Sequence, residues 1–521
     1  MAHTLHKKSI VKKTIQIGGS TLMSRFLGII RELLTIKYLG VGAASDAFIT
    51  AYKIPNSLRK IFAEGALSAA FIPSFVTSLR KDKHEAFSLM SLAFILFEGI
   101  LLIVCALTMF FAPSVVKFAA PGFSAQQAAS TVPLLRILMP FIFFISSSAL
   151  LAGALQAVGH FFVPAFGPIL LNIVFIGGLL ICWFFQLPVA YLCFFILFGG
   201  LLQFLQHLLV YFKLDLSFGS VNKQTFVSFS SILGKFLLCS ISMSVMEVSL
   251  FIDTQFASYL PEGSVSLITY ANRFMGIPLG VFAVAFSTIL LPYFSRLSTY
   301  APKRLNFYLF ESAKLVFWVT IPCMLAMIFF SEKIFVTLFL SPTFTAAHAH
   351  EAGYILIAFV IGLFFFSFNK IILNVYYALH QTFLPSIVSI IATLANIAFN
   401  FAFINIFHAV GLALATTLSG VLQTLLLLYF LKSKFGFHGY IYHFWGFVVR
   451  YIFQLAAMST IFLLVYKGIV YLLSTNVPPA ISHFFLESLG FWLWVGPLCL
   501  MVGLLLYLYR GLFGVRLYFL D

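Results

Sequence analysis

Long apolar segments, separated by short polar ones, make up almost the whole chain. A membrane-spanning helix needs about 20 predominantly apolar residues, and windows of that length predict about fourteen spans here. The spans lie near residues 12–39, 45–78, 87–111, 128–157, 161–185, 188–212, 226–256, 264–295, 305–330, 349–379, 383–406, 410–432, 441–473 and 486–512. This pattern predicts an all-α polytopic membrane protein.

The second span, residues 45–75, is charged as well as apolar. Its charged residues are Asp46, Lys53, Arg59, Lys60 and Glu64. A charge at membrane depth costs roughly 2.5–3.5 kcal/mol on insertion scales, so it usually faces a watery cavity or a partner. All of them except Arg59 share one side of an ideal helix, and Pro55 would turn the second half to bring Arg59 closer. The alternative is an amphipathic helix that lies on the membrane surface.

The first span has a polar arc of its own. On an ideal helix this arc covers roughly 120° and contains Ser24, Arg25, Gly28, Arg31, Glu32 and Thr35. We expect it to share a polar space with the charged side of the second span. The alternative is that Arg31 pairs with Asp46, or Arg25 with Glu32, only to hold helices together.

The distribution of charge indicates a membrane protein and argues against a nucleic-acid partner. Only 9% of the residues are charged, against about 25% in a soluble globular chain. The net charge is +16, and the loop Lys and Arg residues gather on one side of the predicted membrane. This asymmetry follows the positive-inside rule and predicts that both termini are cytoplasmic. The six cysteines lie singly in apolar segments without metal or redox spacing, so we expect them to be small core residues.

An offset of about 219–221 residues relates the two halves of the chain. Residues 70–79 then match 289–298, and residues 154–164 match 375–385. Such repeats are typical of transporters that bind their substrate between two pseudo-symmetric bundles. We therefore expect an N-terminal six-helix lobe at 1–220, a C-terminal six-helix lobe at 221–436, and a C-terminal helix pair at 437–521.

The repeat also adds a basic residue to the predicted cavity. Arg273 lies in the second-half counterpart of residues 45–75. With Arg25, Arg31 and Arg59 it would form a cationic cluster contributed by three helices. The planar guanidinium group binds phosphate through paired hydrogen bonds and keeps its charge. In a low-dielectric cavity such a cluster should be hydrated or hold an anion.

Further polar residues lie in other apolar spans. Asp253, Asn396, Asn400 and Thr416 carry oxygen atoms that suit a sodium ion, although ordinary hydrogen bonds between helices are an equal alternative. Lys370 is predicted to line the cavity. The last two spans are rich in Phe, Leu and Trp, which indicates either plain packing or an apolar groove for a lipid tail.

Four segments closely resemble the MurJ (MviN) family of lipid II flippases, of the multidrug/oligosaccharidyl-lipid/polysaccharide exporter superfamily. They are SRFLGIIRE (24–32), DAFITAYKIPNSLRKIFAEGALSAAFIPSF (46–75), PAFGPILLN (164–172) and ANRFMGIPLGVFAVAFSTILLP (271–292). The resemblance covers nearly the whole chain. It implies fourteen helices in two six-helix lobes plus a C-terminal pair.

The resemblance also implies a function and a set of site residues. The function is transport of undecaprenyl-diphosphate-linked disaccharide-pentapeptide (lipid II) to the outer leaflet of the bacterial inner membrane, for peptidoglycan assembly. The family's cavity positions match Arg25, Arg31, Asp46, Arg59 and Arg273. Lys53, Asn56 and Glu64 lie in the matching block, Lys370 matches a basic position, and Asp253, Asn396, Asn400 and Thr416 fall where some members resemble a sodium site. The implied partners are lipid II, membrane lipids and the peptidoglycan synthesis and division machinery.

The chain departs from the family at three positions. Asn272 stands where many relatives have aspartate, Gly276 replaces a common acidic residue, and Glu32 replaces a frequent aspartate. These changes make the cavity more basic. They argue against a proton or salt-bridge switch that uses an acid beside Arg273.

The expected mechanism is alternating access without covalent chemistry or a required cofactor. Membrane potential, at about 2.3 kcal/mol per charge per 100 mV, or a sodium ion could drive the return of the empty carrier. The nearest alternative is an exporter of another polyprenyl-diphosphate-linked saccharide, because the sequence does not reveal the sugar. A drug exporter should have an acidic cavity, and a polyprenyl-phosphate-dependent membrane enzyme should have acidic catalytic residues near a loop. Neither pattern is present.

Overall fold

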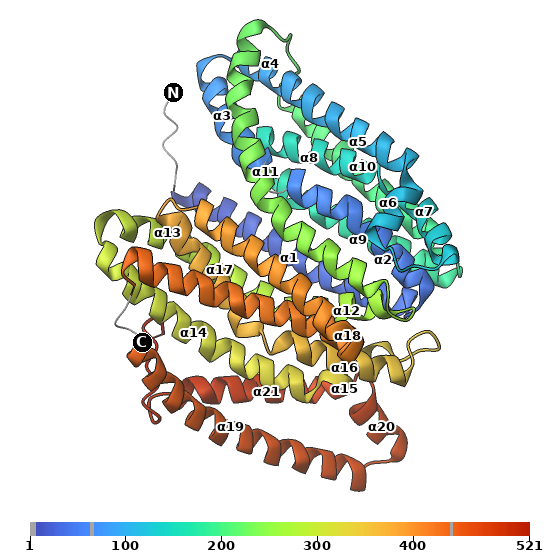
Figure 1. The fold of residues 1–521 in the computed structure, drawn as a ribbon, viewed down its shortest axis with the longest axis vertical. Helices are drawn as coiled ribbons and strands as arrows, with labels where there is room; N and C mark the ends of the chain where they lie inside the picture. Colours follow the sequence, from blue (N-terminus) through green and yellow to red (C-terminus); the bar gives the residue numbers. More distant parts are fainter. Residues whose placement is uncertain (1–6, 63–66, 438–440, 521) are drawn as a thin grey trace. The chain divides into compact units, whose positions relative to one another are not determined.

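The computed structural model describes residues 7–62, 67–437 and 441–520, and its regular structure within these ranges is helical (Figure 1). The helices are α1 (Lys7–Leu39), α2 (Ala43–Arg59), α3 (Leu67–Lys81), α4 (Lys83–Ala93), η2 (Phe94–Glu98), α5 (Gly99–Phe110), α6 (Ala112–Ala119), α7 (Ala125–Leu138), α8 (Phe141–Ala157), α9 (Phe162–Phe184), α10 (Val189–Lys213), α11 (Lys223–Ala257), α12 (Ser264–Pro278), η3 (Leu279–Val284), α13 (Ala285–Tyr300), α14 (Pro302–Phe329), α15 (Ser331–Phe339), α16 (Ala346–Val360), α17 (Leu363–Ala378), α18 (Phe383–Phe435), α19 (Ile441–Thr475), α20 (Pro479–Glu487) and α21 (Phe491–Leu508). The elements η2 and η3 are π-helical turns.

The apolar segments of the sequence become helices because only helices and closed barrels satisfy all backbone hydrogen bonds in lipid. Nine helices or helix runs in the described ranges are long and apolar enough to span a membrane, and the bent pair α16 and α17 makes a tenth. Helix α18 covers two predicted spans, 383–406 and 410–432. Its helical backbone is interrupted between them at His408, which has φ of 49° and ψ of −127°. These helices are consistent with fourteen spans, and that number stays a prediction.

Two compact units make up the chain: an N-terminal unit, Met1–Ser266, and a C-terminal unit, Leu267–Asp521. In the N-terminal unit α1 packs on α9, α9 on α10, α10 on α8, and α2 on α7. Helix α11 packs on α3 and α4 and so belongs to this unit by its contacts. The predicted lobe limits at residues 220 and 436 rest on the offset between the two halves of the sequence and stay a prediction.

Each unit has its own apolar core. In the N-terminal unit, Phe71, Phe75, Met90, Phe97 and Tyr211 are among the buried side chains that join α3, α4, η2, α8, α10 and α11. The close approach of α9 to α10 requires a residue without a side chain, because a Cβ atom at Gly178 would lie 2.5 Å from Cβ of Phe195. Small residues at helix contacts are the usual means of close packing in membrane proteins.

The C-terminal unit has two clusters of buried apolar side chains, and α14 contributes residues to both. One cluster joins α13, α14, α17 and α18, and the other joins α14, α19, α21 and the C-terminal segment.

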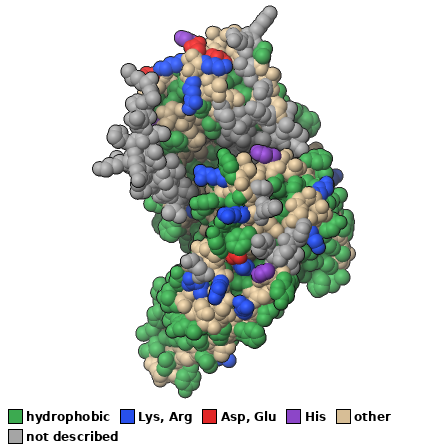
Figure 2. All heavy atoms as spheres, turned by 90° about the vertical axis from the view of Figure 1, so that its left-hand side faces the viewer, with side chains coloured by type: hydrophobic (Ala, Val, Ile, Leu, Met, Phe, Trp, Pro, Cys, Tyr) green, Lys and Arg blue, Asp and Glu red, His purple; other side chains and the backbone are tan. Residues whose placement is uncertain are grey.

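The outer surface is apolar as well: hydrophobic side chains cover much of the face in Figure 2, with Lys and Arg in separate groups and few acidic side chains. A soluble protein rarely exposes so much contiguous apolar surface, whereas a protein surrounded by lipid does.

Candidate functional site

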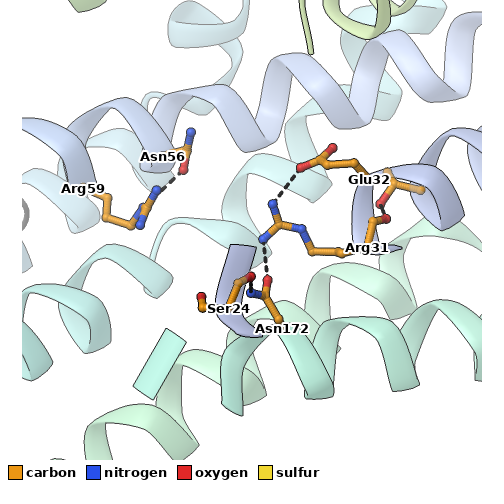
Figure 3. Close-up of polar contacts among 7 residues, drawn as sticks. Ser24, Arg31, Glu32, Asn56, Arg59 and Asn172 are labelled. Carbon is orange, nitrogen blue, oxygen red and sulfur yellow. Dashed lines mark hydrogen bonds and ion pairs between the residues drawn. The ribbon is translucent and has the colours of Figure 1, made fainter. Parts of the chain in front are cut away.

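Arg31 is held by three groups in the N-terminal unit. Its Nη1 donates to Asn172 Oδ1 at 3.0 Å, and its Nη2 donates to Glu32 Oε1 at 2.6 Å (Figure 3). The guanidinium group also lies over the ring of Phe175, 5.2 Å from its centroid, which is a favourable cation–π arrangement. Asn172 is fixed in turn by donating to the backbone oxygen of Ser24 at 3.1 Å. The position of Arg31 is therefore set by α1 and α9 together.

This arrangement decides between the pairings considered for Arg31. Its acidic partner among the described residues is Glu32, its neighbour in the chain, and not Asp46. The ion pair is partly exposed, with 20% and 23% of the two side chains accessible. Exposed pairs contribute only about 0–1 kcal/mol to stability, so we regard it as orienting the arginine rather than holding the fold.

Asp46 accepts backbone hydrogen bonds at the start of another helix. Its side chain is buried, with the residue 2% exposed, and its Oδ2 and Oδ1 atoms accept from the N–H groups of Gly263 at 2.7 Å and Ser266 at 2.8 Å. Helix α12 begins at Ser264, so the carboxylate satisfies donors that the helix itself leaves unpaired. A negative charge at this end also complements the helix dipole. Asp46 thus serves as a helix cap here, and its predicted place in a substrate cavity stays a prediction.

The polar side of α2 faces α11. Lys53 Nζ donates to Thr254 Oγ1, Ser57 Oγ donates to Glu247 Oε2 at 2.6 Å, and Lys60 Nζ donates to Glu247 Oε1 at 3.0 Å. Glu247 lies on α11 and was not among the predicted site residues. Its contacts make it the acidic partner of the second half of α2.

Asp253, the acidic member of the predicted sodium site, also lies on α11. Its negative charge acts on the ammonium group of Lys53. A basic partner of this kind competes with a cation for the carboxylate, because both would neutralise the same charge. Any role of Asp253 in sodium binding stays a proposal.

Arg59 and Asn56 lie at the end of α2. Arg59 Nε donates to Asn56 Oδ1 at 3.2 Å, and in Figure 3 the Arg59 and Arg31 side chains extend toward each other from the two sides of the view. Helix α2 continues through Pro55 without interruption and is followed by a π-helical turn at residues 60–62. Glu64, predicted for the same site, lies outside the described residues.

Arg25 lines a cavity of about 430 Å³. The other lining residues come from α1, the end of α8 and the start of α9, namely Ser24, Gln156, Phe161, Pro164, Ala165 and Pro168. Arg25 is largely exposed, in contrast to the half-buried Arg31. The N-terminal unit therefore carries the predicted basic residues of α1 and α2 on partly accessible surfaces.

The remaining predicted residues belong to the C-terminal unit. Arg273 on α12 and Lys370 on α17 are half-buried. Asn400 Nδ2 donates to Asn396 Oδ1 at 3.2 Å, and Asn396 Nδ2 donates to Thr416 Oγ1 at 3.4 Å. Three of the four predicted sodium ligands thus lie together, joined by hydrogen bonds across the interruption in α18.

An apolar cavity of about 600 Å³ also lies in the C-terminal unit. Its walls are α14, α19 and α21, with lining residues that include Trp318, Pro322, Phe329, Leu455, Met458, Phe462, Cys499, Val502 and Leu506. For the last two spans the sequence left open either plain packing or an apolar groove. The contribution of α14 was not predicted, because hydropathy does not show which helices pack together.

Comparisons with known proteins agree on one family. The family model for lipid II flippase MurJ matches residues 36–486. A relative from Haemophilus influenzae, named a probable lipid II flippase MurJ, is 32% identical over 433 residues, which cover 78% of this chain and 83% of the relative.

Solved structures support the same assignment. A structure of lipid II flippase MurJ in an inward closed conformation matches with a TM-score of 0.76 and 28% identity, covering 96% of this chain and 99% of that chain. An inward-facing MATE multidrug transporter matches with a TM-score of 0.69 and 14% identity, covering 77% and 93%, and this likeness concerns the fold alone. The predicted all-α transporter fold is confirmed. The chain belongs to the lipid II flippase MurJ family.

Proposed function

We propose that this protein is a lipid II flippase, which moves the undecaprenyl-diphosphate-linked disaccharide-pentapeptide from the inner to the outer leaflet by alternating access. The observation that carries the proposal is the set of basic side chains on α1 and α2 of the N-terminal unit: Arg25, Arg31, Lys53 and Arg59. Family membership supports the identity of the substrate. The basic side chains supply the chemistry that a diphosphate requires.

The diphosphate is bound by guanidinium groups that are already oriented. Asn172 and Phe175 fix Arg31, and Asn56 fixes Arg59 through its Nε atom. A preoriented group loses less conformational entropy when it binds. Each hydrogen bond to a charged group contributes about 1.5–3 kcal/mol, which corresponds to roughly tenfold to a hundredfold in affinity.

The polyprenyl tail lies in the apolar cavity formed by α14, α19 and α21. Lipid tails are as apolar as the lining residues, so moving the tail from lipid into this cavity gains little hydrophobic free energy. The cavity therefore orients the tail and contributes little to affinity. The tail stays at membrane depth throughout, and only the polar head crosses.

Ion coupling is a separate part of the proposal. A cationic site responds to membrane potential at about 2.3 kcal/mol per charge per 100 mV, so the potential can drive the empty carrier back. A sodium ion held by Asn396, Asn400 and Thr416, with or without Asp253, could add to this force. The three C-terminal residues lie close together, since amide nitrogens of Asn400 and Asn396 donate to Asn396 Oδ1 and Thr416 Oγ1.

The chain is a multi-pass membrane transporter. We place it in the bacterial inner membrane with both termini in the cytoplasm, on the basis of its loop charges. Membrane lipids surround it. Lipid II connects it to the peptidoglycan synthesis and division machinery.

Transport by the purified protein in liposomes tests the proposal. Fluorescent lipid II is placed in both leaflets, and its exposure to a membrane-impermeant quencher is followed over time. Wild-type protein should equilibrate the leaflets, whereas Arg31→Ala and Arg59→Ala should slow the exchange by roughly tenfold or more. Arg80→Ala, which removes an exposed arginine from the last turn of α3, is the matched control and should behave as wild type. Equal rates in all four proteins would contradict the proposed site, and no exchange by wild type would contradict the function.

A further inference from the structure

Glu98 is a buried acid that the proposed transport site does not use. It ends the π-helical turn η2 in the N-terminal unit, and the residue is only 2% exposed. On the same stretch Ile95 is 61% and Leu102 is 51% exposed. The helix thus turns its apolar residues outward, as expected toward lipid, and its one acid toward the interior of the unit.

Only one of the two carboxyl oxygens of Glu98 has a hydrogen-bond partner in the described part of the chain. Ser146 Oγ donates to Oε1 at 2.7 Å, whereas Oε2 is fully buried and unpaired. Ser147 Oγ on α8 is likewise buried and unpaired. This hydroxyl lies close enough to act on the carboxyl group but is not in hydrogen-bonding geometry.

The described charged side chains on the neighbouring helices lie away from Glu98. Helices α4, α6, α7 and α8 pack against η2 or α5, and Phe229 and Phe236 of α11 pack on Phe97 of η2. On α11, Glu247 pairs with Lys60 and Asp253 acts on Lys53, whereas Lys223 and Lys235 lie outside the described side chains. Helix α8 carries no charged residue, and the charged groups of the others are Lys83, His84 and Glu85 in the first turn of α4, Lys117 of α6 and Arg136 of α7. Lys117 and Arg136 are exposed, and Arg136 donates to the Met109 backbone oxygen. The titratable group near Glu98 is the Cys105 thiol, which donates to the Met139 backbone oxygen at 3.4 Å.

These surroundings favour a neutral carboxyl group. A buried carboxylate with one unpaired oxygen and no cation among the described side chains is strongly unfavourable, since it loses its hydration without compensation. A protonated carboxyl group carries no charge, so it loses far less hydration free energy at this buried position than a carboxylate does. The neutral form of Glu98 therefore fits these surroundings better than the charged form.

We propose that Glu98 is a proton-binding site: it holds a proton in the conformation described here and releases it to water in another conformation of the transport cycle. The π-helical turn provides a route between the two states. A π turn holds one residue more than an α turn and often marks a functional site, and its conversion to α-helix would rotate Glu98 by about 100° relative to one flank. That rotation would take the carboxyl group away from Ser146 and Ser147. The link to transport rests on the proposed function, whereas the binding of the proton does not.

Infrared difference spectroscopy of the purified full-length protein tests the proton site directly. The C=O stretching band of a protonated carboxylic acid should be present in wild type and in Glu487→Gln, and absent in Glu98→Gln. Glu487 is the matched control because its side chain is 59% exposed. The band should decrease as the pH rises from about 5 to about 9, a range that brackets an ordinary and a deeply buried glutamate. Absence of a Glu98-dependent band, a band that does not titrate, or loss of the band on addition of sodium at constant pH would each overturn the proposal.

Transport measurements test the link to the cycle. Glu98→Gln keeps a neutral, hydrogen-bonding side chain and should retain the wild-type melting temperature. We expect it to transport lipid II about tenfold more slowly and without the pH dependence of wild type and Glu487→Gln. The wild-type rate and pH profile in Glu98→Gln would overturn the coupling. If the band titrates but the wild-type protein moves no lipid II, the proposed function fails and the proton site stands.

Discussion

Replacing Asp46 with alanine should destabilise the N-terminal unit before it affects the handling of substrate. The substitution leaves the N–H groups of Gly263 and Ser266 without their acceptors at a buried position. Each unsatisfied buried donor costs about 1–3 kcal/mol, and loss of an N-cap side chain costs about 0.5–2 kcal/mol. We therefore expect the free energy of unfolding to fall by about 2–4 kcal/mol. Asp46→Asn keeps one acceptor oxygen and should lie between alanine and wild type.

Thermal unfolding in detergent measures this loss. Cys105, Cys182 and Cys193 are buried, so a thiol-reactive dye reports their exposure when the unit unfolds. A change of 1 kcal/mol shifts the melting temperature of a unit of this size by roughly 2–4 °C. Asp46→Ala should therefore melt roughly 4–16 °C below wild type, on the same scale.

Asp82→Ala is the matched control for this prediction. Asp82 is also an aspartate at a helix N-cap, but it is exposed and accepts one backbone hydrogen bond, from His84 N at 3.0 Å. Its loss should cost about 1 kcal/mol or less. If Asp46→Ala melts like wild type but transports no lipid II, the capping account is refuted. Asp46 would then act in the substrate cavity, as the family resemblance implied.

Three further substitutions test other parts of the molecule. Asn172→Ala removes the acceptor 3.0 Å from Arg31 Nη1, and the loss of one orienting hydrogen bond of about 1 kcal/mol should slow liposome transport roughly fivefold. Asn172→Asp keeps the acceptor but loses the donor to the Ser24 backbone oxygen, so it should recover part of the rate, and an unchanged rate in the alanine variant would refute the orienting role. Gly178→Ala places a Cβ atom 2.5 Å from that of Phe195 and should lower the free energy of unfolding by about 1–3 kcal/mol. The same dye assay measures this loss, and an unchanged melting temperature would contradict the prediction. Val502→Trp fills the apolar cavity and should slow transport of long-tailed lipid II more than transport of a short-tailed analogue. Equal slowing of both substrates would show that the cavity does not hold the tail.

Much of the fold follows from local sequence because the membrane leaves few choices. Apolar segments must form helices in lipid, and the charged side of residues 45–75 must find partners or water. The structure places Lys53, Ser57 and Lys60 against α11, in keeping with a polar side on this stretch. That Glu247 is their partner was not predictable from the sequence. It lies 190 positions from Ser57 and 187 from Lys60 in the chain, and no local pattern relates residues so far apart.

The pairing of individual charges depends on tertiary structure. Asp46 finds its donors 217 and 220 residues along the chain, at a helix start that hydropathy does not locate. Arg31 and Glu32 are neighbours in a helix and point in different directions from the backbone, so helical periodicity did not suggest the pair. The long arginine side chain bends to reach Glu32 and Asn172 together.

Some features depend on breaks in regularity that a hydropathy window averages out. The interruption at His408 lies between two apolar segments whose separation was predicted, although the residue that causes it was not. The π turn that carries Glu98 gave no signal beyond the acid itself. The short helices α6, α15 and α20 are too short to appear as spans.

The central claim is that this protein carries lipid II across the membrane, and its depletion from living cells tests that claim most directly. After depletion, the leaflet in which lipid II accumulates is measured with a probe that reaches only the outer surface. The account predicts that lipid II accumulates in the inner leaflet and that its exposure outside falls. Restoration of wild-type protein should reverse this change, and Arg31→Ala protein at equal abundance should not. Unchanged exposure of lipid II on the outer surface after depletion would contradict the account.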